Sequence, residues 1–529
     1  MEANTEKVPK HQARPIPEQQ FFYNLLSMKK MKQHLGRNTC GNNVPTKNET
    51  VTDIEKGGDA LDSSSYSERE SVLVDATKLS PMRKLHIVVA GFTCTFNGNL
   101  GSSMPSGALD AISENFGVSN RVHLILLNSL FMCGYVLGPL LFGPLSEYIG
   151  RRPVLIGTYL GYFVFMLACS GAPNYPALLV FRLLSGINAA APMTVIGGLY
   201  ADVLDNPAVR GNAMAVYVSV TTVGPLIGPI VSGFSSPVSW RWPFWIAGIM
   251  AACGLPLVLT LPETYAPVLH NKPAKRQSKS NNSLRERQQQ FELKPFEVRK
   301  IFLRPMKLLF TEPILLFTSA YLTLAYAVFY LLFQAYPVIF QGFYGLPPGL
   351  AGLAFLPVII GVFLGLATFW TWTCHYDRET KAGAKWTQDP INRRLPLVCM
   401  AAPLMVIALF WLGWTVWPST SPIVPMFSGV LFGWGFNLLF MGIINFLTDV
   451  FRQYSASAHA AASMTRSIGA ILLPLAANRM YADLGVHWAP SVLGFIALAT
   501  GMIPFVFIKS GDRLARSSRT AREAFAIED

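Results

Sequence analysis

The sequence predicts an all-α membrane protein with twelve transmembrane helices in two six-helix bundles and both termini in the cytoplasm. The first observation is composition: 51% of the 529 residues are hydrophobic, only 14% are charged, and the mean hydropathy is +0.35. Soluble proteins of this length are less apolar. The second is a series of long apolar runs, and the third is a bias of basic residues toward the loops on one side of the membrane.

Six apolar runs predict the first bundle, residues 81–261. Each is close to the ~20 residues that an α-helix needs to cross a bilayer. The second run carries no charge from Val122 to Phe142, and the fourth holds a single arginine, Arg182. The runs cover residues 85–108, 122–145, 153–171, 175–202, 211–234 and 242–261.

Six further runs predict the second bundle, residues 313–508. Several are interrupted by glycine or proline, so their ends are less sharply defined than those of the first set. They cover residues 313–340, 347–373, 395–417, 422–448, 456–480 and 489–508.

A basic segment, residues 262–312, separates the two sets and predicts their orientation. Its lysines and arginines outnumber its acids, which places it in the cytoplasm by the positive-inside rule. Counting helices from this segment puts Arg151 and Arg210 on the same side, whereas the opposite loops hold little more than Arg121 and Arg241.

Two tails complete the predicted organisation. Residues 1–80 are polar and lack the features of a signal peptide, so we expect a disordered cytoplasmic tail, and residues 509–529 form a second cytoplasmic tail. The net charge of +13 does not indicate nucleic acid, because the charges lie in loops between apolar runs. Two sets of six helices favour a transporter whose halves rock about a midplane site, although other polytopic membrane proteins share this topology.

A charged turn links the second and third runs and contains Gly143, Glu147, Gly150, Arg151 and Arg152. The Glu147 carboxylate can cap the positive end of a neighbouring helix, while the arginines bind acidic or carbonyl partners on the cytoplasmic face. We expect a conformational latch that holds one state shut and releases in another. The alternative is a solvated loop that only fixes orientation.

Arg182 in the fourth run has no acid beside it. An intramembrane cation is costly unless it faces the bundle interior or water, so it either tunes the proton affinity of a nearby group or extends to the membrane interface. The fifth run contains two Gly-Pro pairs that kink the helix and permit close packing. These residues, with a following glycine, are Gly224, Pro225, Gly228, Pro229 and Gly233.

The three features resemble motifs A, B and C of the major facilitator superfamily. In motif A, Glu147 stands where Asp is commoner and Tyr148 replaces a basic residue. Motif C is the antiporter signature, which uptake carriers of the family usually lack. Over about residues 80–512 the chain resembles fungal drug:H+ antiporters of the twelve-span type, notably at residues 240–246, 261–265, 463–467 and 484–495.

The resemblance implies the major facilitator fold and a proton-coupled antiporter that exports lipophilic xenobiotics or a secreted metabolite across the plasma membrane, or alternatively the vacuolar membrane. A uniporter, a proton symporter for a small metabolite and a polyamine exporter are the alternatives. No Asp or Glu lies in the middle of a predicted run, which disfavours a polycation because nothing would neutralise it. A membrane enzyme is disfavoured because no histidines show paired metal-ligand spacing.

Polar and aromatic residues within the runs are candidates for the substrate cavity. Those in the seventh run recur at helical spacing and suit flat or lipophilic guests, although ordinary packing explains such a stripe equally well. Arg466 could attract an anionic group. The cavity candidates are Asn97, Asn128, Asn188, Tyr326, Tyr330, Gln334, Asn437, Asn445 and Arg466.

The proton carrier is not identified by the sequence, and Arg182, Asp202 and His459 are the candidates. The seven cysteines are scattered without a CxxC pair, so they predict neither a metal site nor a disulfide framework. We expect no cofactor, with the proton gradient as the energy source. The expected partners are a lipophilic substrate, protons and the bilayer, and the protein is expected to be a monomer that binds no nucleic acid.

Overall fold

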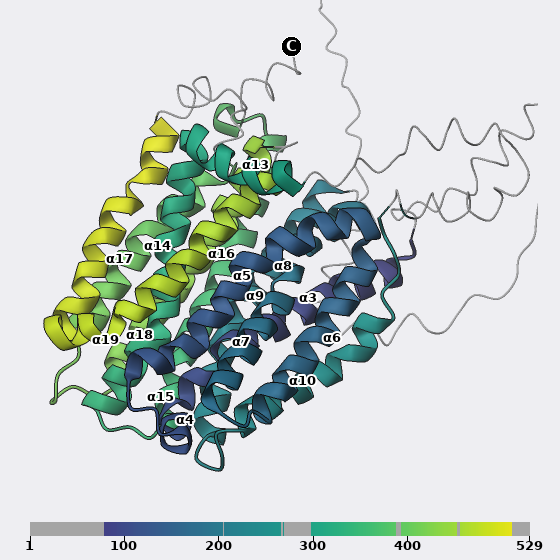
Figure 1. The fold of residues 1–529 in the computed structure, drawn as a ribbon. Helices are drawn as coiled ribbons and strands as arrows, with labels where there is room; N and C mark the ends of the chain where they lie inside the picture. Colours follow the sequence, from purple (N-terminus) through teal and green to yellow (C-terminus); the bar gives the residue numbers. More distant parts are fainter. Residues whose placement is uncertain are drawn as a thin grey trace, which may run out of the picture. The chain divides into compact units, whose positions relative to one another are not determined.

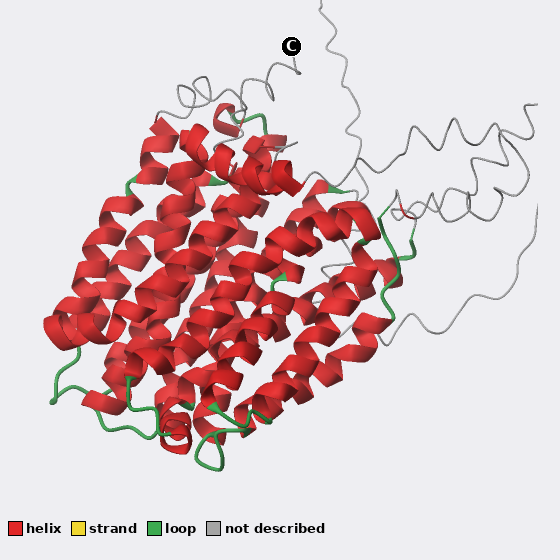
Figure 2. Cartoon of the chain, in the orientation of Figure 1, coloured by secondary structure: helices red, strands yellow, loops and turns green. Residues whose placement is uncertain are grey.

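The computed structural model describes residues 79–204, 206–265, 268, 298–387, 393–451 and 455–509. Every regular element in these ranges is helical (Figures 1 and 2), which confirms the all-α prediction. Ten helices in the described ranges are long and apolar enough to cross a membrane. The total of twelve transmembrane helices stays a prediction, as do the domain boundaries and the cytoplasmic location of the termini. Both tails and most of the basic segment lie outside the described residues.

The first set of apolar runs forms helices close to the expected positions, with one division. The fourth run is two helices that meet at Ala190, because Pro192 lacks an N–H group and cannot continue the hydrogen-bond ladder of the preceding helix. The elements are α3 (Pro81–Ser103), η2 (Met104–Gly107), α4 (Leu109–Phe116), α5 (Arg121–Ile149), α6 (Arg151–Ser170), α7 (Tyr175–Ala189), α8 (Ala191–Val203), α9 (Pro207–Ser235) and α10 (Trp242–Leu259).

A short helix, α13, lies at the end of the basic segment and precedes the second set, which ends in a long broken helix, α19. Gly485 interrupts α19 with φ 75° and ψ 176°, which separates the eleventh and twelfth predicted runs. The elements are α13 (Val298–Thr311), α14 (Pro313–Tyr336), the π-helix η3 (Pro337–Phe343), α15 (Pro348–Gly352), η4 (Leu353–Phe355), α16 (Leu356–Lys381), η5 (Lys385–Thr387), α17 (Leu395–Trp414), α18 (Ile423–Phe451) and α19 (Ser455–Gly501).

Local sequence signals explain several helix ends. The side chains of Asn120 and Asn174 accept hydrogen bonds of 2.9 Å from the backbone N–H groups of Val122 and Ala177, so each caps the helix that follows. Gly150, with φ 106°, ends α5 in a conformation that residues with a Cβ rarely adopt.

Small residues bring the helices close together. A Cβ on Gly134 of α5 would overlap the backbone of Ile187 in α7, and one on Gly433 of α18 would overlap the backbone of Val358 in α16. Close backbone approach at small residues is a general means of packing membrane helices. The most extensive contacts join α5 to α7, α14 to α19, and α18 to both α16 and α17, and α5 also packs against α19.

Candidate functional site

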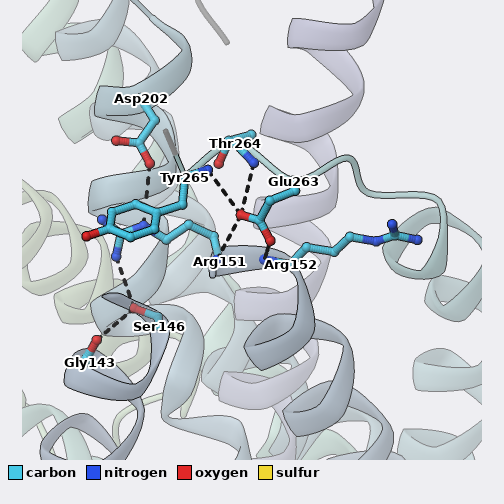
Figure 3. Close-up of polar contacts among 8 residues, drawn as sticks. All are labelled: Gly143, Ser146, Arg151, Arg152, Asp202, Glu263, Thr264 and Tyr265. Carbon is cyan, nitrogen blue, oxygen red and sulfur yellow. Dashed lines mark hydrogen bonds and ion pairs between the residues drawn. The ribbon is translucent and has the colours of Figure 1, made fainter. Parts of the chain in front are cut away.

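Four backbone N–H groups converge on the carboxylate of Glu263, which follows α10 (Figure 3). Arg151 and Arg152, the first residues of α6, donate from their backbone nitrogens at 3.0 and 3.2 Å, and Thr264 and Tyr265 donate at 3.0 Å each. A carboxylate at a helix N-terminus satisfies unpaired N–H groups and interacts favourably with the helix dipole. Glu263 therefore joins the end of α10 to the start of α6.

Gly150 is required at this junction for two reasons. Its φ of 106° favours glycine, and a Cβ there would lie 2.5 Å from Oε2 of Glu263. A larger residue would strain the backbone and displace the carboxylate that caps α6.

The Arg151 side chain is 9% exposed and contacts three other segments. Its Nε lies 3.4 Å from Oδ2 of Asp202 on α8, and its Nη1 donates to the Ser146 hydroxyl of α5 at 3.0 Å. The guanidinium also lies 5.1 Å from the centre of the Tyr265 ring. Burial raises the pKa of the Tyr265 hydroxyl, so the ring stays neutral beside the cation.

The structure differs from the expectation for Glu147. Its side chain is exposed, and no hydrogen bond or ion pair joins it to another residue in the described ranges; the acid that caps a helix is Glu263. The acidic partner of Arg151 is Asp202, and the Arg152 side chain extends away from the cluster (Figure 3). The carboxylate of Glu263 was not predicted as part of the site, although an acid placed just after the sixth run is a signal that could have identified it.

A second arginine–aspartate ion pair, with the same distance as that between Arg151 and Asp202, lies later in the chain. Arg394, directly before α17, places its Nε 3.4 Å from Oδ2 of Asp449, near the end of α18. The sequence analysis did not identify this pair. The signal was present, since an arginine pair and a proline lie at the start of both helices: Arg151, Arg152 and Pro153 begin α6, whereas Arg393 and Arg394 precede α17, whose second residue is Pro396.

Arg182 on α7 is fully buried and satisfied by backbone oxygens, so it does not extend to the membrane interface. It donates to the carbonyls of Leu127 at 2.9 Å, Gly101 at 2.7 Å and Ser102 at 2.9 Å. Gly101 lies four residues before Pro105, which has no N–H group, so its carbonyl has no helical donor at that position. Arg182 therefore caps the C-terminal turn of α3.

The Gly-Pro helix α9 packs against α3 through Gly224 and Gly228, since a Cβ on Gly228 would overlap the Ser103 hydroxyl. That hydroxyl donates to the Pro225 carbonyl, which has no helical donor because Pro229 stands four residues later. Farther along α9, a Cβ on Gly233 would lie 2.5 Å from the Pro348 carbonyl of α15. Gly352 of α15 approaches α9 just as closely, because a Cβ there would lie 2.7 Å from the Pro229 carbonyl.

In the described ranges, three side-chain hydrogen bonds link helices of the first set to helices of the second. Ser102 and Tyr330 join hydroxyls at 3.1 Å, and the Asn437 amide donates to the Ser219 hydroxyl at 3.0 Å. The third is a weak contact of 3.8 Å between a guanidinium nitrogen of Arg466 and the sulfur of Met193. Three of the predicted cavity residues, Tyr330, Asn437 and Arg466, thus lie at contacts between the two sets.

The other predicted cavity residues are distributed more widely. Tyr326 and Gln334 are buried in α14, and the Asn128 amide donates to the Ser106 hydroxyl at 3.0 Å. The remaining asparagines bond to carbonyls one turn earlier in their own helices, which gives no evidence for a cavity role; these are Asn97, Asn188 and Asn445.

The three proton-coupling candidates do not contact one another among the described residues. Asp202 pairs with Arg151, Arg182 binds backbone carbonyls, and His459 lies 2.9 Å from the Thr448 hydroxyl. Their role in coupling stays a prediction.

Apolar helices of spanning length, buried cations within them and polar links between two helix sets define a polytopic membrane protein of the transporter class. The model of the Major Facilitator Superfamily matches residues 91–415. The chain belongs to this superfamily.

Its relatives include fungal efflux pumps. The chain is 36% identical over 433 residues to efflux pump FUB11 of Gibberella moniliformis, covering 80% of this chain and 72% of the relative. It is 34% identical to the MFS-type efflux pump MFS2 of Trichophyton rubrum, covering 85% and 76%, and 36% identical to the citrinin biosynthesis cluster MFS transporter mrr1 of Monascus ruber, covering 83% and 89%.

A solved structure shares the fold. The proton:xylose symporter XylE, bound to 6-bromo-6-deoxy-D-glucose, matches with a TM-score of 0.58 and 16% identity over 81% of this chain and 97% of that chain. The family and this neighbour confirm the predicted class of fold.

We expect Glu263→Gln to destabilise the N-terminal end of α6. The substitution keeps one acceptor oxygen but removes the charge that interacts with the helix dipole, at a cost of about 1 kcal/mol. Thermal unfolding of the purified protein would report the loss. Glu147→Gln is the matched control, because its carboxylate is exposed, and equal destabilisation by both variants would contradict the assigned cap.

Proposed function

We propose that the protein exports lipophilic small molecules in exchange for protons, by alternating access across the plasma membrane. The observation that carries the proposal is the character of the contacts between the two helix sets. The three side-chain links described above involve no ion pair, so separating them breaks only weak or neutral hydrogen bonds, each with a modest net free energy of about 1 kcal/mol. These polar links therefore oppose separation of the two sets only weakly.

Two further observations support export rather than uptake. The relatives include proteins named efflux pumps, and the Gly-Pro helix α9 packs closely against α15 at Gly233. That contact lies near the end of α9 that the charge pattern predicts to face outward. A close seal there suits an exchanger, which must prevent leakage while it changes state.

The test combines direction, energy source and substrate class. A drug-sensitive host that expresses the protein is grown on a panel of lipophilic toxins and on polyamines, with and without a protonophore. Membrane vesicles with an imposed pH gradient then report the direction of flux. We expect resistance to lipophilic toxins, and we expect the protonophore to abolish this resistance. In vesicles, the substrate should move in the direction opposite to the flow of protons. The proposal would be overturned if the host became resistant to polyamines alone, or if the substrate moved in the same direction as the protons.

The cytoplasmic turn is proposed to act as the latch. Arg151→Ala removes the contacts with Asp202, Ser146 and Tyr265 together, so we expect export to fall about tenfold, because each 1.4 kcal/mol of lost stabilisation changes an equilibrium by that factor. Glu147→Gln is expected to lower export less, since the Glu147 side chain is exposed and makes no hydrogen bond or ion pair with any residue that the structure describes.

Efflux from cells, corrected for protein at the membrane, measures the effect. Arg121→Ala is the control, because Arg121 lies outside the turn and its ion pair of 4.0 Å with Asp110 is exposed on both sides, where such a pair contributes little. Export at the parental rate by both Arg151→Ala and Glu147→Gln would show that the turn is not a latch.

A further inference from the structure

Of the buried arginines in the described ranges, Arg182 and Arg466 have no acidic partner, and they differ in how many of their N–H groups are hydrogen-bonded. Arg182 uses its Nε and both terminal nitrogens to bind backbone carbonyls. Arg466 on α19 is only 9% exposed, yet its Nε has no hydrogen-bond partner among the described residues. Its one hydrogen bond to oxygen is from Nη2 to the Ser463 hydroxyl at 3.2 Å. Arg466 therefore has N–H groups, including that of Nε, that are available to donate hydrogen bonds to a ligand.

The charge of Arg466 is also uncompensated. No Asp or Glu in the described ranges pairs with it, and its remaining polar contact is the 3.8 Å approach to the Met193 sulfur. A buried cation without a counter-charge costs several kcal/mol. Ionisable groups within spanning helices that carry such a cost mark functional positions by default.

Two aromatic rings, those of Tyr326 and Phe440, lie beside the Arg466 guanidinium. Its central carbon lies 5.6 Å from the centre of the Tyr326 ring and 5.7 Å from that of the Phe440 ring. Phe440 stacks on Phe436 at 4.6 Å, and Tyr326 packs against Tyr330 at 4.9 Å. Cation–π contacts hold the guanidinium in place, but the ring faces do not accept a hydrogen bond from its Nε–H group. The rings therefore form an apolar wall beside an N–H group that has no acceptor.

The position of Arg466 suits a substrate that must be released. Its own helix belongs to the second set, whereas Met193 lies near the start of α8 in the first set, the helix that also carries Asp202. A ligand bound to Arg466 would replace the weak thioether contact when the two sets separate. Binding there is therefore coupled to the movement that alternating access requires.

We propose that Arg466 binds the carboxylate of an organic monoanion whose planar, apolar body packs against Tyr326 and Phe440. The inference rests on the proposed export function and narrows its substrate class. A carboxylate can accept two parallel hydrogen bonds from a guanidinium. One cation neutralises one negative charge, so a dianion would bring a buried charge without a partner.

The test compares a planar carboxylate with its neutral isostere. Full-length protein in nanodiscs is equilibrated at neutral pH with 2-naphthoate or 2-naphthamide, and binding is measured by equilibrium dialysis. We expect the parental protein to bind 2-naphthoate at least about tenfold more tightly, which corresponds to one charge-assisted contact. Arg466→Gln should remove this preference while retaining binding of 2-naphthamide, and Arg466→Lys should keep part of it.

Arg479→Gln is the matched control. Arg479 lies on the same helix, but its side chain is 90% exposed and pairs with Asp483, so both affinities should stay at the parental values. The proposal is overturned if the parental protein shows no preference for the carboxylate, if Arg466→Gln keeps the preference, or if Arg466→Gln loses both ligands equally. Export of neutral toxins in the vesicle assay is measured separately, so these outcomes leave the export proposal standing.

Discussion

Arg182→Leu should abolish export and lower the stability of the protein by on the order of 3–5 kcal/mol, because it leaves buried carbonyls without donors. Arg182 is fully buried and binds the carbonyls of Gly101 and Ser102 in the last turn of α3. The Gly101 carbonyl cannot find a helical donor at Pro105. Leucine fills part of the volume and supplies none of the three hydrogen bonds. Thermal unfolding in detergent and efflux from cells measure the two effects.

Arg182→Lys distinguishes the role of Arg182 as a cap for backbone carbonyls from the role of its positive charge. An ammonium keeps the positive charge but has no rigid fork, so it reaches fewer of the three carbonyls. If Arg182 acts mainly as a cap, the lysine variant should lose most of the stability that leucine loses. If its charge tunes a proton site, the variant should keep the pH dependence of export despite reduced stability. Both roles would be contradicted if Arg182→Leu or Arg182→Lys had the melting temperature and the export rate of the parental protein.

Much of the fold was predictable because its signals are local. Runs of uncharged apolar residues indicate spanning helices, and each predicted run corresponds to helix in the described ranges. The division of the fourth run at Ala190 was not predicted, although Pro192 provides a sufficient reason. A break between residues 480 and 489 was predicted from the two apolar runs, and the structure places it at Gly485, whose backbone conformation supplies the physical cause.

The candidate site was less predictable because its contacts join distant parts of the chain. The motif residues identified the turn at Gly150 and Arg151, but Glu263 lies more than a hundred positions away and binds through its carboxylate to backbone N–H groups. Backbone donors leave no pattern in the sequence. For the same reason, Arg182 and Arg466 look alike as lone arginines in apolar runs, and only the surrounding carbonyls distinguish a satisfied cation from an unsatisfied one.

Gly233→Leu should reduce export strongly while leaving the stability of each helix set nearly unchanged. The side chain would meet the Pro348 carbonyl of α15, where a Cβ alone would lie 2.5 Å away. Because this contact joins α9 to a helix of the second set, the substitution opposes closure of the two sets at this end. Overpacking typically costs about 1–3 kcal/mol, enough to shift an equilibrium between two states by roughly one or two orders of magnitude.

Gly228→Leu tests a different surface of the same helix. It would overlap the Ser103 hydroxyl of α3, which lies within the first set, so we expect lower thermal stability together with lower export. Gly157→Leu on α6 is the control for added bulk, since a Cβ there meets nothing within 4 Å. Efflux rate and melting temperature, measured on the three variants together, distinguish the two effects. Parental export by Gly233→Leu would mean that the approach of α9 to α15 is not needed for exchange, whereas equal destabilisation by Gly233→Leu and Gly228→Leu would mean that both glycines serve folding alone.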